Sequence, residues 1–246
     1  MQPQRGYTLV ELMVALVLGL LLTAASLMIF LSTSQTYSAQ KANSEIEKNG
    51  GTGLNYIIHK FRLIASNGGI VAHSLSTTES TTSNVNNDEI TITYTVSQDR
   101  FDANRAHNQN GDGSQLMTCD GRILNANDNV RERYFVQNGG IFCQSTLNNQ
   151  LSAGTQIVPN VDYFHVVLIT QDNNSNFRKT NLAGVNGEAI VGLQMGVILH
   201  SDSAIQGATY LNNTNIVNVI DQNIQLRQIA THNLKQLFVQ TIALRQ

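Results

Sequence analysis

The chain has 246 residues, a length that suits one domain or one domain with an appendage. Its 15 Lys and Arg residues nearly balance its 17 Asp and Glu residues, and a formal net charge of −2 argues against nucleic-acid binding through bulk charge. Charged residues form only 13% of the chain, so neutral polar side chains dominate the predicted surface, as in many extracellular proteins. Hydrophobic residues form 41%, which is enough for a core and excludes wholesale disorder.

The first predicted element is a long apolar helix. Residues Leu12–Leu31 form a run of 20 without a charge. As a helix this run is about 30 Å long, which matches the hydrocarbon core of a bilayer. A secretory signal peptide has a shorter apolar region of about 7–15 residues, followed by a small-residue cleavage site. The residues after Leu31 do not fit such a site, so the run predicts a membrane-spanning helix.

The residues before the apolar run are polar and distinctive. Met1–Gly6 is a short leader with one positive charge, at Arg5, and Glu11 stands at the edge of the predicted membrane span. A carboxylate at the centre of a bilayer costs about 2.5–3.5 kcal/mol, and less near the interface. A glutamate in this position is therefore a candidate functional residue.

The segment Arg5–Leu12, with the sequence RGYTLVEL, resembles the processing site of type IV prepilins and type II secretion pseudopilins. The resemblance implies that a membrane aspartyl peptidase cuts between Gly6 and Tyr7 and methylates the new N-terminus at Tyr7. It also implies that Glu11 is the assembly glutamate, which pairs with the α-amino group of a neighbouring subunit when the helices bundle. The first mature residue is usually Phe in this family, whereas here it is Tyr.

The same helix is predicted to continue as an amphipathic segment. Apolar residues at 54, 57, 58, 61, 64 and 65 follow helical spacing, so we expect one helix from about Thr8 to Ala65. The glycine-rich stretch Asn49–Gly53 predicts a kink or interruption, because glycine costs about 1 kcal/mol relative to alanine in a helix interior. Gly19 is a second candidate weak point. A nucleotide-binding role for Gly51-x-Gly53 is not favoured, because no strand precedes it and no phosphate-loop lysine follows.

The rest of the chain predicts a β-rich head. Residues 89–97 alternate between apolar and polar side chains, and further strands are expected at 131–137, 140–144, 162–169, 190–200 and 236–245. Asn138-Gly139-Gly140 is a hairpin signal, the strand at 162–169 is expected to be central, and 215–235 could hold a short helix. The predicted fold is α+β and type IV pilin-like, with the helix laid across an antiparallel sheet. The expected segments are a leader at 1–6, a filament-core helix at 7–31, an amphipathic half at 32–65 and a head at 66–246.

The two cysteines, Cys119 and Cys143, are predicted to form a disulfide. A head that faces the periplasm lies in an oxidising compartment, where disulfides persist. Two free buried thiols are the alternative. A zinc site is less favoured, because the sequence has no CxxC or paired-histidine spacing.

The remaining acidic residues and histidines do not predict a catalytic, cofactor or metal site. The loop Asn108–Gly113 partly imitates the start of a calcium loop, but Cys119 stands where the bidentate glutamate would be. Asp99, Asp102 and Asp112 leave weak calcium binding open. His59 and His165 lie among apolar residues and are expected to be satisfied core or boundary residues. The histidines show no metal-ligand spacing; they are His59, His73, His107, His165, His200 and His232.

The Cys119–Cys143 region, residues 157–167 and the closing segment 238–245 are similar to minor pilins of the PilW family. The resemblance implies a non-enzymatic subunit that is anchored in the inner membrane by one helix, with a cytoplasmic N-terminus and a periplasmic head, and that later lies in the pilus at the cell surface. Implied partners are other minor pilins, the major pilin, a large tip adhesin, prepilin peptidase and the assembly platform. Implied processes are priming of assembly, twitching motility, adhesion and DNA uptake.

Three alternatives remain open at this point. The chain could be a minor pseudopilin of a type II secretion or competence system, since the N-terminus does not separate these systems. A membrane-anchored periplasmic enzyme would keep its leader and would gather titratable groups in a pocket. A calcium- or glycan-binding tip adhesin would respond to its ligand through the head.

Overall fold

The computed structural model describes residues 8–65, 70–75, 86–98, 116–180, 185, 188–204, 216–225 and 233–244, with side chains described outside 63–65 and 70–75. Gly6, Tyr7 and the loop Asn108–Gly113 lie outside the described residues. The elements are one helix, α1 (Leu9–Ala65), and the strands β1 (Ile70–Leu75), β2 (Asp88–Thr95), β3 (Asn129–Gln137), β4 (Gly140–Leu147), β5 (Gln150–Leu151), β6 (Thr155–Pro159), β7 (Val161–Gln171), β8 (Phe177–Thr180), β9 (Ala189–Ala204), β10 (Ile216–Val219), β11 (Gln222–Gln225) and β12 (Asn233–Ala243).

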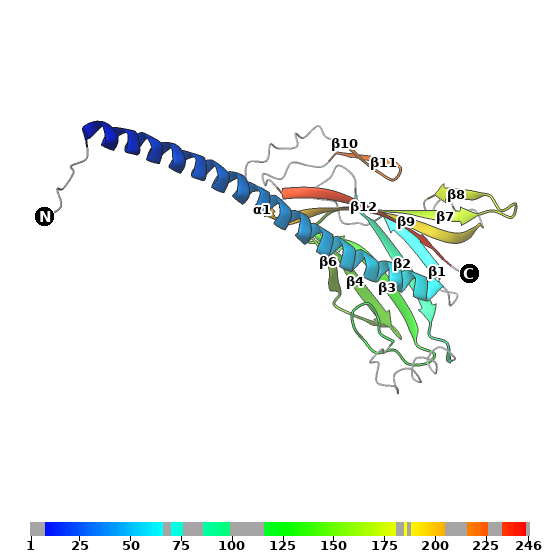
Figure 1. Ribbon diagram of the computed structural model, residues 1–246. Helices are drawn as coiled ribbons and strands as arrows, with labels where there is room; N and C mark the ends of the chain where they lie inside the picture. Colours follow the sequence, from blue (N-terminus) through cyan, green and yellow to red (C-terminus); the bar gives the residue numbers. More distant parts are fainter. Residues whose placement is uncertain are drawn as a thin grey trace.

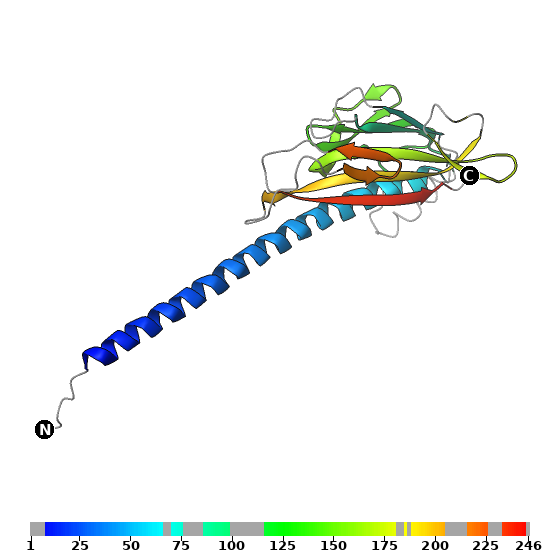
Figure 2. The same cartoon turned by 90° about the horizontal axis from the view of Figure 1, so that it is seen from above.

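The helix α1 runs without interruption for 57 residues, from Leu9 to Ala65. The predicted kink or interruption at Asn49–Gly53 is therefore wrong. Figures 1 and 2 show that the N-terminal half of α1 projects away from the head, whereas the C-terminal half lies along it. The reason why the glycines do not break the helix lies in what packs against them.

The buried face of α1 is a narrow stripe that contains two of the three clustered glycines. A Cβ on Gly50 would stand 2.8 Å from Cζ of Phe238, and a Cβ on Gly53 would stand 2.6 Å from Cγ2 of Val158. The glycines therefore let the helix backbone approach β12 and β6 closely, and the packing of the helix on the strands offsets their low helix propensity. The fully or nearly buried side chains of the stripe are Ala42, Ile46, Leu54, Ile57, Ile58 and Phe61.

One sheet of the head has six antiparallel strands in the order β1-β2-β3-β4-β5, with β6 also paired to β4. The predicted hairpin at Asn138 and Gly139 is confirmed, because both residues have positive φ angles, 49° and 70°, as a two-residue type I′ turn requires. A second pair in the left-handed region, Asn148 and Asn149, joins β4 to β5.

The other main sheet has four antiparallel strands in the order β12-β9-β7-β8. Its strand β7 lies between β9 and β8, as expected for the apolar segment 162–169. The expectation of a short helix within 215–235 is wrong for residues 216–225, which form the hairpin β10–β11. Figure 1 shows this hairpin on the opposite side of the four-stranded sheet from α1. The head therefore has two main sheets, whereas we expected one.

One hydrophobic core joins the helix to both sheets. Ile57 and Phe61 of α1 pack in it with Tyr134 and Ile141 of the six-stranded sheet, and with Leu193 of the four-stranded sheet. The rings of Phe61 and Tyr134 lie with their centroids 5.5 Å apart. Because the helix and both main sheets share this core, the second half of α1 is an integral part of the head rather than an appendage.

Candidate functional site: the projecting half of the helix

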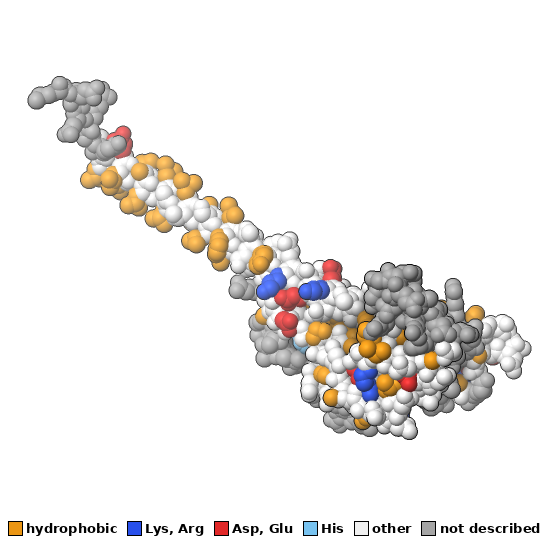
Figure 3. Space-filling view, turned by 90° about the horizontal axis from the view of Figure 1, so that it is seen from below, with side chains coloured by type: hydrophobic (Ala, Val, Ile, Leu, Met, Phe, Trp, Pro, Cys, Tyr) orange, Lys and Arg blue, Asp and Glu red, His pale blue; other side chains and the backbone are white. Residues whose placement is uncertain are grey.

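The projecting half of α1 presents apolar side chains to its surroundings on all sides. Every residue from Leu9 to Thr33 is exposed, and Met28 is exposed to 73%. Figure 3 shows hydrophobic side chains along this projecting segment. Among the described residues, α1 is the one helix that is long and apolar enough to cross a membrane. A surface of this kind requires lipid or other apolar helices around it.

Three hydroxyl groups in the projecting half are satisfied within the helix. The hydroxyls of Thr23, Ser26 and Thr33 donate to backbone carbonyls three or four residues earlier, at distances of 2.8–2.9 Å. Such back-bonding removes the cost of placing an unpaired hydroxyl in an apolar environment. The segment is therefore compatible with a hydrocarbon environment despite these polar residues.

Glu11 caps the start of α1 together with Thr8. The Glu11 Oε2 atom accepts hydrogen bonds from the Thr8 backbone N–H, at 3.1 Å, and from the Thr8 hydroxyl, at 3.2 Å. The Glu11 backbone N–H in turn donates to the Thr8 hydroxyl at 3.3 Å. This reciprocal pattern is a capping box, which satisfies backbone donors that a helix start leaves without partners.

The capping box relates Glu11 to the predicted cleavage site, the two parts of the N-terminal motif. Glu11 lies at the third helical position, where the helix dipole favours a negative charge. The predicted scissile bond, between Gly6 and Tyr7, precedes the capping residue Thr8 by one residue. Glu11 is therefore held against Thr8, the second residue of the predicted mature chain.

The second half of α1 is attached to the head by polar contacts at both ends. Glu45 accepts the hydroxyl of Ser203 at 3.0 Å and its backbone N–H at 3.3 Å, which anchors the helix to β9. Nearer the end of the helix, Lys60 donates to the carbonyl of Met117 and Tyr56 donates to the carbonyl of Cys119 at 3.3 Å. The loop that carries Cys119 is thus attached directly to α1.

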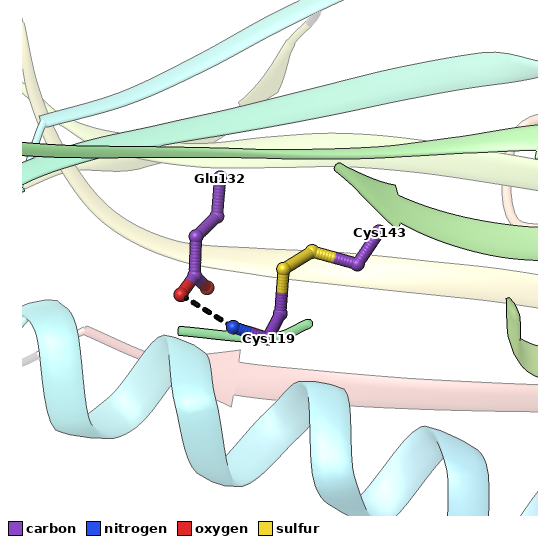
Figure 4. Close-up of side chains that lie close together, drawn as sticks. All are labelled: Cys119, Glu132 and Cys143. Atoms are coloured by element: carbon purple, nitrogen blue, oxygen red, sulfur yellow. Dashed lines mark hydrogen bonds between the residues drawn. A yellow bond between two sulfur atoms is a disulfide. The ribbon is translucent and has the colours of Figure 1, made fainter. Parts of the chain in front are cut away.

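The predicted disulfide between Cys119 and Cys143 is present, and it fastens this loop to β4. Figure 4 shows the disulfide beside Glu132 of β3, whose Oε1 atom accepts the Cys119 backbone N–H at 2.9 Å. The fully buried Glu132 carboxylate also accepts the hydroxyl of Tyr134 at 2.9 Å. Burial, together with the Glu132 charge, raises the pKa of Tyr134 well above its ordinary value, so this tyrosine stays a donor.

The two sulfur atoms and a Glu132 oxygen lie within 4.8 Å of one another, a spacing that could suit a metal ion. Thiolates, rather than disulfide sulfurs, are the cysteine ligands that bind metals. In the oxidised chain this cluster is accordingly a structural clamp between the loop, β3 and β4.

The sequence does not indicate the partners of the buried polar residues. Glu132 and Asp162 carry no local signal of a functional role, and His59, expected among apolar residues, is exposed on α1. His165 is buried, as expected, but its neighbours are carboxylates rather than apolar groups. These partners come from distant parts of the chain, so no local pattern could have indicated them.

Comparisons with known proteins point to the same N-terminal segment. Residues 1–27 match the prokaryotic N-terminal methylation motif. No curated protein matches the chain. A type IV-like pilin from Thermus thermophilus is 8% identical, with a TM-score of 0.47 over 80% of this chain and 96% of the other.

The chain thus carries a prepilin-type methylation signal, and the predicted α+β arrangement, in which a long apolar helix packs on antiparallel sheets, is confirmed. The methylation signal and the exposed apolar helix fit a protein that is anchored in a membrane.

Proposed function

We propose that the chain is a minor pilin of the type IV pilus and that it resembles the PilW family. The observation that carries this proposal is the continuity of the methylation motif at residues 1–27 with a helix whose side chains are exposed and mostly apolar as far as Thr33. Such a helix suits both a bilayer and a bundle of similar helices, which are the two environments that a pilin meets.

The proposed pathway has two stages. The precursor spans the inner membrane, with the Arg5-containing leader in the cytoplasm, in line with the positive-inside tendency. Prepilin peptidase cuts between Gly6 and Tyr7 and methylates Tyr7, which leaves the capped helix start near the new N-terminus. In the filament, Glu11 pairs with the α-amino group of a neighbouring subunit, because an unpaired carboxylate among apolar helices costs several kcal/mol.

The proposed partners are other minor pilins, the major pilin and, at the pilus tip, a large adhesin. The head then docks on neighbouring heads while its own helix joins the filament core. Support for the PilW-like role comes from the region around the Cys119–Cys143 clamp and from the closing segment 238–245.

Mass spectrometry of sheared surface filaments tests the proposal. We expect an N-methylated peptide that starts at Tyr7, at a low ratio to the most abundant pilin. A processed protein that stays in the cell envelope and is absent from pili would favour a type II secretion or competence pseudopilin. An intact leader in wild-type cells would overturn the proposed processing.

A variant pair tests the role of Glu11. We expect Glu11→Ala to be processed but excluded from filaments. The control, Glu47→Ala, changes an exposed glutamate in the second half of the same helix, which accepts only the Asn43 amide at 3.2 Å in the described structure. Normal incorporation of Glu11→Ala would contradict the assembly role, as would equal loss of both variants from filaments.

A further inference from the structure

His165 of β7 lies between two aspartates that come from different layers of the head. Its Nδ1 atom is 2.7 Å from Oδ2 of Asp88 at the start of β2. Its Nε2 atom is 2.6 Å from Oδ1 of Asp221 in the β10–β11 turn. The ring therefore connects both sheets and the hairpin at a single point.

The geometry fixes the charge of the ring. An ionised carboxylate only accepts hydrogen bonds, and a neutral imidazole has one N–H, whereas an imidazolium has two. The Asp88 carboxylate is held as an acceptor, because its Oδ2 atom also accepts the Val166 backbone N–H at 2.8 Å. Both ring nitrogens can donate to carboxylates only when His165 is protonated.

A second polar contact joins the hairpin to β7. Tyr163 donates its hydroxyl to Gln222 Oε1 at 2.6 Å. Beneath the hairpin, Val219 and Ile224 form an apolar cluster with Tyr163 and Ile198, separate from the main core. Val217, Ile220 and Leu237 are partly buried against this cluster. Because an isolated two-stranded hairpin is marginally stable, its contacts with the sheet, polar links included, hold it in place.

We propose that the His165 imidazolium is a pH-sensitive latch that holds the β10–β11 hairpin against the sheets, and that its deprotonation releases the hairpin. The described titratable groups that face the ring are Asp88 from β2, Asp221 from the turn and Tyr163 from β7, whose ring stacks on the imidazole at 6.2 Å. On β9 the residue opposite His165 is Gly196, which carries no charge.

The direction of the pH effect follows from the surroundings of the ring. Burial alone would lower the pKa of His165, but the hydrogen bonds and charges of Asp88 and Asp221 raise it above its ordinary value. The stabilisation is complete below the unfolded pKa of histidine, about 6.5, and is lost as pH rises through the higher folded pKa. For Tyr163, by contrast, burial raises the pKa of the phenol, so Tyr163 does not titrate in the pH range in which His165 loses its proton.

Deprotonation acts mainly on the link to Asp221. One ring nitrogen then turns a lone pair toward a carboxylate oxygen, which is repulsive. The Asp88 side chain is only 1% exposed and cannot be rehydrated in place, whereas the Asp221 side chain is 58% exposed. The remaining N–H therefore stays with Asp88, Asp221 turns to water, and the hairpin loses its charged attachment.

Hydrogen–deuterium exchange of the full-length chain in detergent tests the latch, with rates corrected for the intrinsic effect of pH. We expect protection of residues 219–224 to fall by about tenfold or more between pH 6 and pH 10, while protection in β9 is unchanged. In Asp221→Asn, residues 219–224 should be less protected at pH 6 than in the wild type, and their protection should change little as pH rises to 10. Asp202→Asn, an exposed aspartate bound to the Asn160 amide, should behave as the wild type does.

Nitrogen chemical shifts of the His165 ring give an independent readout and should show an imidazolium at pH 6 and at pH 7. A neutral ring at pH 6 would overturn the proposal. It would also be overturned if the protection of residues 219–224 in the wild type stayed constant from pH 6 to pH 10. The same holds if this protection fell as much in Asp221→Asn as in the wild type.

Discussion

Gly53 of the long helix lies directly against Val158 of β6, so that a Cβ at position 53 would stand 2.6 Å from the valine Cγ2 and 3.0 Å from the Ile157 carbonyl oxygen. Neither neighbour can move away easily, because one is a β-branched side chain and the other is backbone. We expect Gly53→Ala to lower the free energy of unfolding of the head by up to about 2 kcal/mol, since overpacking costs about 1–3 kcal/mol and helix propensity returns about 1 kcal/mol. Chemical denaturation of the full chain in detergent measures this change.

Gly51→Ala is the matched control. A Cβ at Gly51 meets no atom within 4 Å, so only the gain in helix propensity remains. We expect a stabilisation of up to about 1 kcal/mol. Changes of opposite sign in the free energy of unfolding at these two glycines would establish close packing at Gly53, whereas changes of the same sign would contradict it.

Lys60 provides a second test, because it is the cation nearest to the fully buried Glu132 carboxylate among the described residues, at 3.9 Å. Lys60→Met keeps the aliphatic stem but removes this charge and the bond to the Met117 carbonyl. We expect a loss of about 1–3 kcal/mol, since three neutral donors still satisfy the carboxylate. Lys41→Met, at an exposed position of the same helix, should change stability by less than about 0.5 kcal/mol in the same denaturation experiment.

Reduction of the Cys119–Cys143 disulfide is expected to destabilise the head by about 3–4 kcal/mol, from the chain-entropy model for a link with a sequence separation of 24 residues. Thermal unfolding with and without a phosphine reductant measures the change. A Cys119→Ser/Cys143→Ser variant should unfold like the reduced chain and should not respond to the reductant. If reductant shifts this variant as well, the effect does not come from the disulfide.

Asp162 is expected to control part of the acid sensitivity of the head. Burial alone would raise the pKa of Asp162, but hydrogen bonds from His200 and Lys235 outweigh burial, so its net pKa lies below the ordinary value. The stabilisation is therefore present above about pH 4, the unfolded pKa, and is lost as pH falls through the folded pKa. We expect Asp162→Asn to be less stable than the wild type at pH 7, and the difference to shrink below pH 4 in pH-dependent denaturation. A constant difference would contradict this assignment.

The sequence was sufficient for features that depend on neighbouring residues. The apolar run and the alternation in β2 predicted their elements, and Asn138-Gly139 predicted its turn. Each of these signals is local, because it comes from side-chain period or from the left-handed backbone preference of the turn. The motif around Glu11 likewise indicated a prepilin-type N-terminus, which the match at residues 1–27 supports.

Features that depend on distant contacts could not be predicted. The glycines at 50–53 predicted a break, because propensity alone does not reveal that strands pack against them. The segment 216–225 is a hairpin rather than part of a helix, and residues such as Tyr163 and His165 that hold it lie more than fifty positions away. For the same reason the contacts of Glu132 with Lys60, Tyr94 and Cys119 were not predicted.

The attachment of the helix to the head has a mechanical consequence. Polar contacts run from Glu45, on Ser203, to Lys60, on the Met117 carbonyl, a span of about 22 Å along a straight helix. A tensile force applied to the projecting half would load this whole packed length in shear, so that many contacts must yield together rather than one after another. The disulfide-linked loop lies at the far end of that span, where its contacts with Tyr56 and Lys60 would also oppose sliding of the helix.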